Sequence, residues 1–393
     1  MKYLVNKGLY IDEGGIEMAK ENFNDTLEDS VMKQEKQQEL YKAVQEGNKN
    51  IVKEIIKRGV DINIILDKTG VTPLHIAAEN GQLEVVKYLV ANGADVNKVN
   101  DNSETPLFYA AAEGHENVVE YLVKNNADMT IEEDDDGNTP LHVAARENHI
   151  KVVKCLLELG ADIDEGNRYY NETALYLAAS KGHANMVKYL IEQGADITIE
   201  ETDEGDMPLH DAASRGYLKV VEYLIDGGAA VNAGNYSGEP PLYQAVDYNH
   251  LEVVKYLIAN GANVNKEDRY GNTSLQKAAE NDNLELVKYL IANGADVNKG
   301  NEDDYTPLYY AVKNYNLELI KYLISKGADV NIKDNRGWTP LVIACELGNE
   351  AIVKILLEEQ LKKGKNKIDI ENNAGKTNSS NKKKKGFEQT IYC

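Results

Sequence analysis

The residues of this chain best suited to chemistry are its seven histidines, because an imidazole can act as a general base or bind a metal ion. Three of them, His75, His142 and His210, end a short block of the type Thr-Pro-Leu-His. The other four follow a glycine or an asparagine at one fixed place further along, at His115, His149, His183 and His250. None lies at metal-ligand spacing from cysteines or carboxylates, so we interpret the histidines as structural residues.

Possible nucleophiles are arranged no more favourably. The three cysteines, Cys155, Cys345 and Cys393, are too few for a disulfide framework and indicate a reducing, cytosolic environment. No serine lies in a nucleophile-elbow motif, and the sequence has neither a phosphate-binding loop nor a dinucleotide-binding fingerprint. We therefore predict a protein that is not an enzyme, with no catalytic residue, metal site or cofactor.

Carboxylates outnumber the basic groups, and many of them are clustered. The chain has 65 Asp and Glu against 43 Lys and Arg, a formal net charge of −22. Clusters at Glu132 to Asp136, Glu200 to Glu204 and Glu302 to Asp304 occupy equivalent places along the chain. Such a row of like charge suits a basic partner and speeds its capture at low salt. The alternative, that the charge serves only solubility, fits the sequence equally well.

A repeat positions all of these residues. Blocks related to Thr-Pro-Leu-His return every 33 or 34 residues, starting at Thr72, Thr105, Thr139, Thr173, Met207, Pro240, Thr273, Thr306 and Thr339. A second block, of the type Gly-Ala-Asp-Val-Asn, keeps the same period, starting at Gly59, Gly93, Asn126, Gly160, Gly194, Gly228, Gly261, Gly294 and Gly327. Two markers that keep step over so many copies indicate stacked supersecondary units.

Each unit predicts two helices. In the copy that begins at Thr72, the threonine is suited to cap the first helix and Pro73 to occupy its first position. Gly81 interrupts that helix. Apolar residues between Leu83 and Val90 recur at helical spacing and predict a second helix, which ends before Gly93. The Asn-, Asp- and Gly-rich stretch that leads to the next unit predicts a tight hairpin.

The blocks at Thr72–His75, Gly93–Asn97 and their copies closely resemble the ankyrin repeat, over roughly residues 37–357. The resemblance implies an all-α repeat solenoid of stacked helix-turn-helix units joined by short hairpin loops. It also implies a concave surface, lined by hairpin tips and first helices, that binds proteins. Met207 departs from the pattern because it lacks the threonine hydroxyl, so we expect its helix cap to be weaker by about 1 kcal/mol.

Tyrosine supplies 24 of the aromatic residues, against three Phe and one Trp. One set shares a single place in the second helix, as at Tyr88, and is interpreted as packing. The resemblance places the other set where partners bind, namely Tyr109, Tyr170, Tyr236, Tyr243, Tyr248, Tyr270, Tyr305, Tyr309 and Tyr310. The further candidates are basic residues after the Ala-Ala pairs, Arg146, Lys181, Arg215 and Lys313, and the cluster residues Glu133, Asp134, Asp135, Asp203 and Asp303.

The repeat pattern covers only part of the chain. We expect residues 1–36 to be a partial repeat remnant with a polar, acidic connector, 37–357 to be the array, and 358–393 to be a disordered Lys- and Asn-rich tail. Lys382 to Lys385 resemble a nuclear import signal, although such a run is more often only a solvated tail. Met1 to Asp12 matches the second-helix end at Val86 to Asn97, as expected for a piece of a longer ankyrin protein or for a decayed capping helix.

Composition limits the kinds of partner that we expect the chain to bind. The acidic array repels nucleic acid, and no apolar run is long enough to span a membrane. We predict a monomeric, cytoplasmic, non-catalytic scaffold that binds proteins, among them proteins with a basic surface, and no small-molecule substrate. The alternative is a targeting or regulatory ankyrin segment of a larger enzyme, channel or secreted effector.

Overall fold

The structure is a computed structural model that describes residues 35–375. Residues 35–45 are helical, and the named helices that follow are α3 (Lys49–Lys57), α4 (Pro73–Glu79), α5 (Leu83–Ala91), α6 (Pro106–Ala112), α7 (Glu116–Lys124), α8 (Pro140–Arg146), α9 (Ile150–Glu158), α10 (Ala174–Ser180), α11 (Ala184–Glu192), α12 (Pro208–Ser214), α13 (Leu218–Asp226), α14 (Pro241–Asp247), α15 (Leu251–Ala259), α16 (Ser274–Glu280), α17 (Leu284–Ala292), α18 (Pro307–Lys313), α19 (Leu317–Ser325), α20 (Pro340–Glu346) and α21 (Glu350–Gly375). No strand occurs between residues 35 and 375, where the only β pairing is two isolated bridges. The predicted all-α repeat solenoid is confirmed.

Local sequence explains where these helices begin and end. Thr105 is the N-cap of α6 and its hydroxyl accepts from the Phe108 amide, while Pro106 takes the first position. Each first helix from α4 to α20 is only seven residues long, as in α6. In the turn that follows α4, Gly81 has a φ of 66°, and a Cβ there would lie 2.6 Å from the His115 ring of the next repeat. Glycine therefore lets consecutive repeats approach at this turn.

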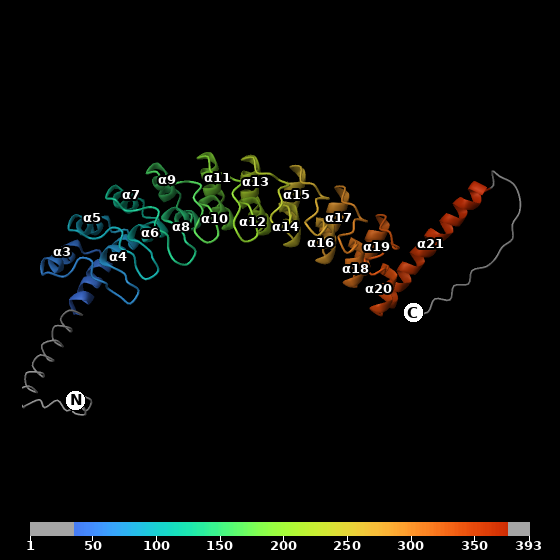
Figure 1. Cartoon of the computed structure of the whole chain (residues 1–393), viewed down its shortest axis with the longest axis horizontal. Helices are drawn as coiled ribbons and strands as arrows, with labels where there is room; N and C mark the ends of the chain where they lie inside the picture. The colour runs from blue at the N-terminus through green and yellow to red at the C-terminus, as the bar shows by residue number, and fades with distance from the viewer. Residues whose placement is uncertain (1–34, 376–393) are drawn as a thin grey trace, which may run out of the picture. The chain divides into compact units, whose positions relative to one another are not determined.

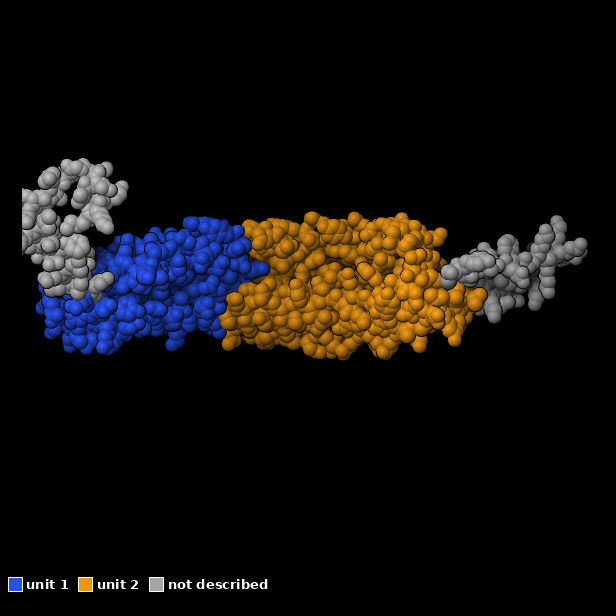
Figure 2. All heavy atoms as spheres, turned by 90° about the horizontal axis from the view of Figure 1, so that it is seen from below, with its two compact units in different colours: residues 1–178 blue, residues 179–393 orange. Residues whose placement is uncertain are grey.

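Two compact units make up the chain, Met1–Ala178 and Ala179–Cys393 (Figure 2). In the first unit, the short helices α4, α6 and α8 pack in one row, while α3, α5, α7 and α9 pack in a second (Figure 1). In the second unit, α12, α14, α16, α18 and α20 form the row of short helices, and α11, α13 and α15 pack in sequence behind it. Each unit is therefore two layers of helices.

The core of each unit lies between these two layers. Leu74, Ala77 and Ala78 of α4 are buried together with Val86 and Leu89 of α5. The alanines present no bulk, so neighbouring first helices can approach closely. Because each helix pair contributes only one such apolar stripe, the stack buries what a single pair would expose.

The last helix differs from the prediction. We expected the array to end at residue 357, with a disordered tail beyond it, but α21 runs from Glu350 to Gly375. The other second helices from α5 to α19 are nine residues long, as in α19 (Leu317–Ser325). No glycine with left-handed backbone stands at the place where those helices end, since residues 358–361 read Glu-Glu-Gln-Leu. The partial repeat at Met1–Asp12 and the Lys382–Lys385 run lie outside the described residues.

Candidate functional site: hairpin tips and first helices

One side chain in each repeat organises the hairpin tip. It is an Asp, Asn or Glu whose side-chain oxygens accept two or more backbone N–H groups of the same turn. We call these residues the tip anchors; they are Asp67, Asn100, Glu133, Asn167, Glu201, Asn235, Asp268, Asn301 and Asp334. A turn held in this way presents its other side chains from a fixed backbone.

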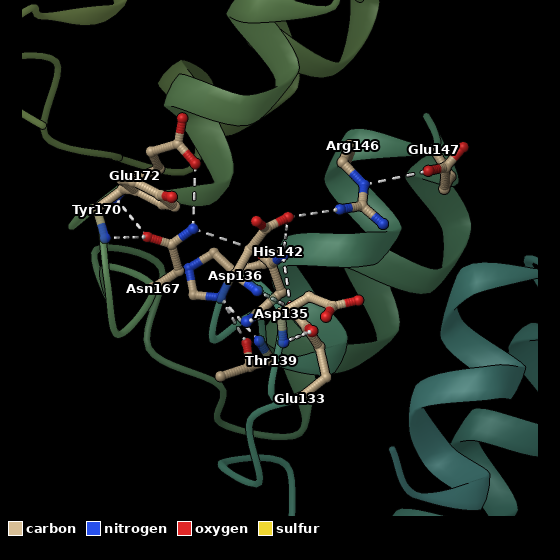
Figure 3. Close-up of polar contacts among 11 residues, drawn as sticks. Glu133, Asp135, Asp136, Thr139, His142, Arg146, Glu147, Asn167, Tyr170 and Glu172 are labelled. Carbon is tan, nitrogen blue, oxygen red and sulfur yellow. Dashed lines mark hydrogen bonds and ion pairs between the residues drawn. The ribbon is translucent and has the colours of Figure 1, made fainter. Parts of the chain in front are cut away.

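Glu133 shows the arrangement most fully (Figure 3). Its Oε2 accepts from the Asp135 amide at 2.6 Å, and its Oε1 accepts from the amides of Asp136 and Asn138, each at 3.0 Å, and from Asn138 Nδ2 at 2.9 Å. Burial alone would raise the pKa of Glu133, but these hydrogen bonds together outweigh it and lower the pKa. Glu201 repeats the pattern with Asp203, Glu204 and Asp206.

The acidic clusters therefore separate into two kinds of residue. Glu133 is only 6% exposed and both its oxygens are occupied, so it holds the tip together instead of facing a partner. Its neighbours Asp134 and Asp135 are exposed, as are Asp203 and Asp303 in the second unit. The sequence prediction counted Glu133 with the exposed carboxylates, whereas the structure assigns it to the scaffold.

Backbone hydrogen bonds join neighbouring tips within each unit. In the first unit, the Asp134 amide donates to the Asn102 carbonyl at 3.0 Å. In the second unit, the Tyr236 amide donates to the Glu204 carbonyl and the Glu302 amide to the Tyr270 carbonyl, each at 2.9 Å. Residues of successive tips are thereby held side by side within each unit, and in the second unit they include carboxylates and tyrosines.

Burial makes the charged form of two carboxyl groups in the second unit unfavourable. Burial, with Glu201 and Asp211 nearby, raises the pKa of Asp206 to about 6, although Asn235 Nδ2 donates to its Oδ1 at 2.9 Å. Burial likewise raises the pKa of Glu239 to about 6, with Asp268 adding to the shift. The carboxyl groups beside these tips therefore titrate closer to neutrality than ordinary Asp and Glu.

The block histidines connect one repeat to the next. His75 Nδ1 accepts from the Thr72 amide at 3.1 Å, and an amide can only donate, so the proton sits on Nε2. That nitrogen donates to the Glu104 carbonyl of the following tip, also at 3.1 Å. Burial lowers the pKa of His75 to about 4, which keeps the ring neutral. Gln276 makes the same two contacts, with the Thr273 amide and the Tyr305 carbonyl.

The turn histidines connect repeats in a second way. His115 Nε2 lies 2.8 Å from the Glu79 carbonyl, and His149 and His250 make the same contact with Ala112 and Ser214. Each carbonyl belongs to the first helix of the preceding repeat, or ends it. The structural interpretation of these histidines agrees with what the structure shows.

The candidate tyrosines differ in exposure. Tyr236 and Tyr270 occupy tips and are 49% and 53% exposed, and Tyr170 and Tyr248 are also exposed. Tyr109 is half-buried, because its hydroxyl accepts from Asn100 Nδ2 at 3.1 Å and its ring meets His75 edge-on at 5.7 Å.

Tyr243 does not belong to the exposed set. It is only 5% exposed, and burial raises its pKa. It stands where His75 and His210 stand in their own blocks, so the pattern Pro-Leu-Tyr already placed it at a packing position. The sequence prediction that Tyr243 faces a partner is therefore corrected.

The four basic candidates occupy two positions instead of one. Arg146 and Lys313 are the last residues of α8 and α18, whereas Lys181 and Arg215 lie one residue past α10 and α12. Arg146 bonds to Glu147 and reaches Asp136 at 3.5 Å (Figure 3), and Arg215 bonds to Asp211 at 2.8 Å. Lys181 and Lys313 are exposed.

Two aromatic tips at the end of the array add residues that the prediction missed. Tyr305 stacks on Tyr309 with ring centroids 3.9 Å apart. In the next tip, the guanidinium carbon of Arg336 lies over the Trp338 ring, 4.5 Å from the ring centroid. Trp338 and Arg336 were not among the candidates. Aligning the repeats with one another could have identified Trp338, because it directly precedes its Thr-Pro block, as Tyr305 does.

A family model described as ankyrin repeats matches residues 10–100, 94–167, 132–201, 164–235, 209–301 and 275–374. The chain belongs to the ankyrin repeat family. Ankyrin repeats are in general protein–protein interaction modules and in general non-catalytic. A search of curated proteins found no match to this ankyrin chain.

Two other properties of the ankyrin chain concern ligands and membranes. Within residues 35–375, no group of His, Cys, Asp and Glu side chains is arranged to hold a metal ion. No helix in the described part of the chain combines the length and the apolar character needed to cross a bilayer.

Proposed function

We propose that this ankyrin protein is a non-catalytic scaffold that binds protein partners through the tips and first helices of its repeats. In the first unit the surface includes Asp134, Asp135 and Tyr170. In the second unit it includes Asp203, Tyr236, Tyr270 and Asp303. Basic residues at the end of some first helices, as at Lys313, complete these surfaces.

The observation that carries the proposal is the exposure of Tyr236 and Tyr270 on consecutive tips. About half of each side chain is open, although each tyrosine belongs to a turn fixed by its anchor, Asn235 or Asp268. A tyrosine on a fixed backbone loses little conformational entropy on binding, and it offers an apolar ring with a polar end. Tyrosine is accordingly enriched among the residues that dominate binding energy.

The exposed carboxylates give this surface its charge. Asp203 and Asp303 lie in the tips on either side of Tyr236 and Tyr270, and both are exposed. With a net charge of −22 on the whole chain, a basic partner would be attracted from a distance at low salt. We infer that the charge acts mainly on the rate of association and the tyrosines mainly on the lifetime of the complex.

The test is capture of partners from a lysate of the source cells on the immobilised full chain. We expect Tyr236→Ser with Tyr270→Ser to lose partners that the parent retains. The matched control is Tyr315→Asn, because Tyr315 is 48% exposed in the turn after α18, outside the tips, and asparagine tolerates its φ of 59°. Circular dichroism must first show equal helix content in all three chains.

A second variant tests the charge of the exposed carboxylates while it leaves the tip anchors unchanged. Asp134, Asp135, Asp203 and Asp303 are changed to Asn, while the anchors Glu133 and Glu201 stay intact. We expect slower capture and a weaker dependence on salt. If the tyrosine variant and the Tyr315→Asn control retain the same partners as the parent, the tips are not the recognition surface.

A further inference from the structure

The residue before each first-helix cap changes character along the array. In six consecutive repeats it is polar, at Glu104, Asn138, Glu172, Asp206, Glu239 and Asn272. In the last two repeats it is aromatic, at Tyr305 and Trp338. Both aromatic residues keep the backbone role of the position, since the amide of each donates to its anchor, Asn301 or Asp334. The aromatic side chains are thus not needed to build these turns.

Three tyrosines of one repeat pack together at this place. Tyr305 and Tyr309 stack face to face at 3.9 Å with an interplanar angle of 10°. Tyr310 meets both rings edge-on, at 6.3 Å from Tyr305 and 5.4 Å from Tyr309. Edge-on and stacked pairs each add to stability beyond burial, so the three rings form one ordered group.

The next tip adds Trp338, whose ring lies against Arg336, and the charge of Arg336 acts on Tyr305 and Tyr309. Asp334 Oδ2 accepts from Arg336 Nη2 at 2.7 Å and from Nε at 3.1 Å, which holds the guanidinium over the indole. The charge of Arg336 is therefore paired within its own turn. We call Tyr305, Tyr309, Tyr310, Trp338 and Arg336 the aromatic cluster.

The aromatic cluster remains partly open to solvent. All three of its tyrosines and Trp338 are partly exposed. The position of Tyr309 is filled in earlier repeats by buried side chains such as His210, Tyr243 and Gln276. Burial still raises the pKa of Tyr309 to about 12, so its phenol is neutral at physiological pH.

Uncompensated negative charge borders the aromatic cluster. Glu302, Asp303 and Asp304 precede Tyr305 directly, and all three are exposed. Within the described part of the chain they form no ion pair. An aromatic surface attracts a cation to its ring faces, and neighbouring carboxylates strengthen that attraction.

We propose that the aromatic cluster is the anchor for an extended, arginine- or lysine-bearing segment of a partner protein. A cationic side chain of the segment lies against the Tyr305, Tyr309 and Trp338 rings, and the carboxylates of Glu302 to Asp304 pair with its charge. Neighbouring repeats lie about 10 Å apart, and a segment in the polyproline II conformation rises about 3.1 Å per residue with three residues per turn, so every third side chain points the same way. Basic residues at every third position of the segment would therefore meet successive tips. This inference rests on the proposed function and names the partner chemistry of the second unit.

The single tryptophan of the chain makes the test specific, because Trp338 reports directly on this site. The probe is a synthetic peptide of about twelve residues with arginine at every third position and proline and serine between, which favours polyproline II and is long enough to span about four repeats. The control peptide replaces each arginine by glutamine. We expect the arginine peptide to shift the fluorescence of Trp338 saturably in the full chain, and the glutamine peptide to leave it unchanged. Raising the salt from about 10 to about 150 mM should weaken binding, because the Debye length falls from about 30 to about 8 Å.

Variants locate the binding on the aromatic cluster. Tyr305→Ala and, separately, Glu302→Gln with Asp303→Asn should each weaken the arginine peptide roughly tenfold. Tyr315→Asn should bind as the parent does, since Tyr315 lies in the turn after α18, outside the tips. Equal shifts with both peptides, or an unchanged affinity in Tyr305→Ala with native circular dichroism, would overturn the inference.

The failure of this inference can be distinguished from the failure of the proposed function. If the lysate experiment shows tip-dependent partners and the arginine peptide fails to bind, the scaffold function stands and the partner chemistry is wrong. If the peptide binds at Trp338 but no partner depends on Tyr236 and Tyr270, the aromatic cluster binds basic segments and the other tips do not bind partners.

Discussion

Removing the Glu133 carboxylate should destabilise the tip that it organises, although the residue lies in the middle of an acidic run. Glu133→Ala leaves three backbone amides and Asn138 Nδ2 without their acceptor. Hydrogen bonds to a charged group contribute about 1.5–3 kcal/mol each, but the amides of Asp135 and Asp136 lie nearer the solvent than the buried Asn138 and can regain water. We therefore expect a total loss of roughly 2–4 kcal/mol in the free energy of unfolding. Relief of repulsion from Asp134 to Asp136 offsets only a small part, because exposed charges interact weakly.

Glu133→Gln should fall between the parent and the alanine variant. A glutamine can keep its carbonyl at Oε1, where three donors meet, but its amino group would face the Asp135 amide, and two donors cannot pair. The matched control is Asp135→Ala, which removes an exposed carboxylate from the same turn and should change stability by less than about 0.5 kcal/mol.

Urea unfolding followed by circular dichroism at pH 7 measures the total loss, and hydrogen exchange of the Asp135, Asp136 and Asn138 amides measures local opening. The pKa of Glu133 is lowered on folding, so its contribution is complete above the ordinary value of 4.5 and is lost as the pH falls through the folded value. The gap between parent and Glu133→Ala should therefore narrow in acid. If Glu133→Ala is no less stable than Asp135→Ala, with equal exchange at the three amides, the assignment of Glu133 as an anchor is wrong.

Two further changes should stabilise the second unit. Asp206→Asn introduces the residue that stands at the equivalent position of a later repeat, Asn272. Asn272 Oδ1 accepts from Asn301 Nδ2 in the same way that Asp206 Oδ1 accepts from Asn235 Nδ2. Because the pKa of Asp206 is raised from 3.8 to about 6 on folding, its charge destabilises the folded state fully above pH 6, and this penalty disappears only as the pH falls through the unfolded value. The variant should therefore gain roughly 2 kcal/mol at pH 8 and less than about 1 kcal/mol at pH 4. Urea midpoints at both pH values measure this, and an equal gain at pH 4 contradicts the charge argument. Met207→Thr restores the missing cap hydroxyl and should add about 1 kcal/mol. Thermal unfolding against a Met207→Ala control checks the cap, which is refuted if the two variants melt together.

The sequence by itself determined the order of the helices and the helices up to α20, because the signals for them are local; the length of α21 was not predicted. A threonine before proline starts a first helix wherever the pair occurs, as at Thr105 and Pro106, and the glycine or asparagine at the end of a second helix stops it. Asn126 illustrates this, since it replaces the usual glycine and still adopts a φ of 68°. Repetition then fixed the stacking, because one register applies to every copy.

Only the tertiary structure decided what the polar and aromatic side chains of the tips do. Glu133 and Asp135 are both acidic residues of one run, yet one accepts four hydrogen bonds and the other faces solvent, since the turn brings the amides to only one of them. Tyr243 and Tyr236 are both tyrosines near a tip, but Tyr243 is buried with Lys277 of the next repeat over its ring, while Tyr236 is about half exposed. Burial depends on the neighbouring repeat and on the path of the turn, which residue type alone does not specify, and so the surface that meets a partner emerges only when the repeats are stacked.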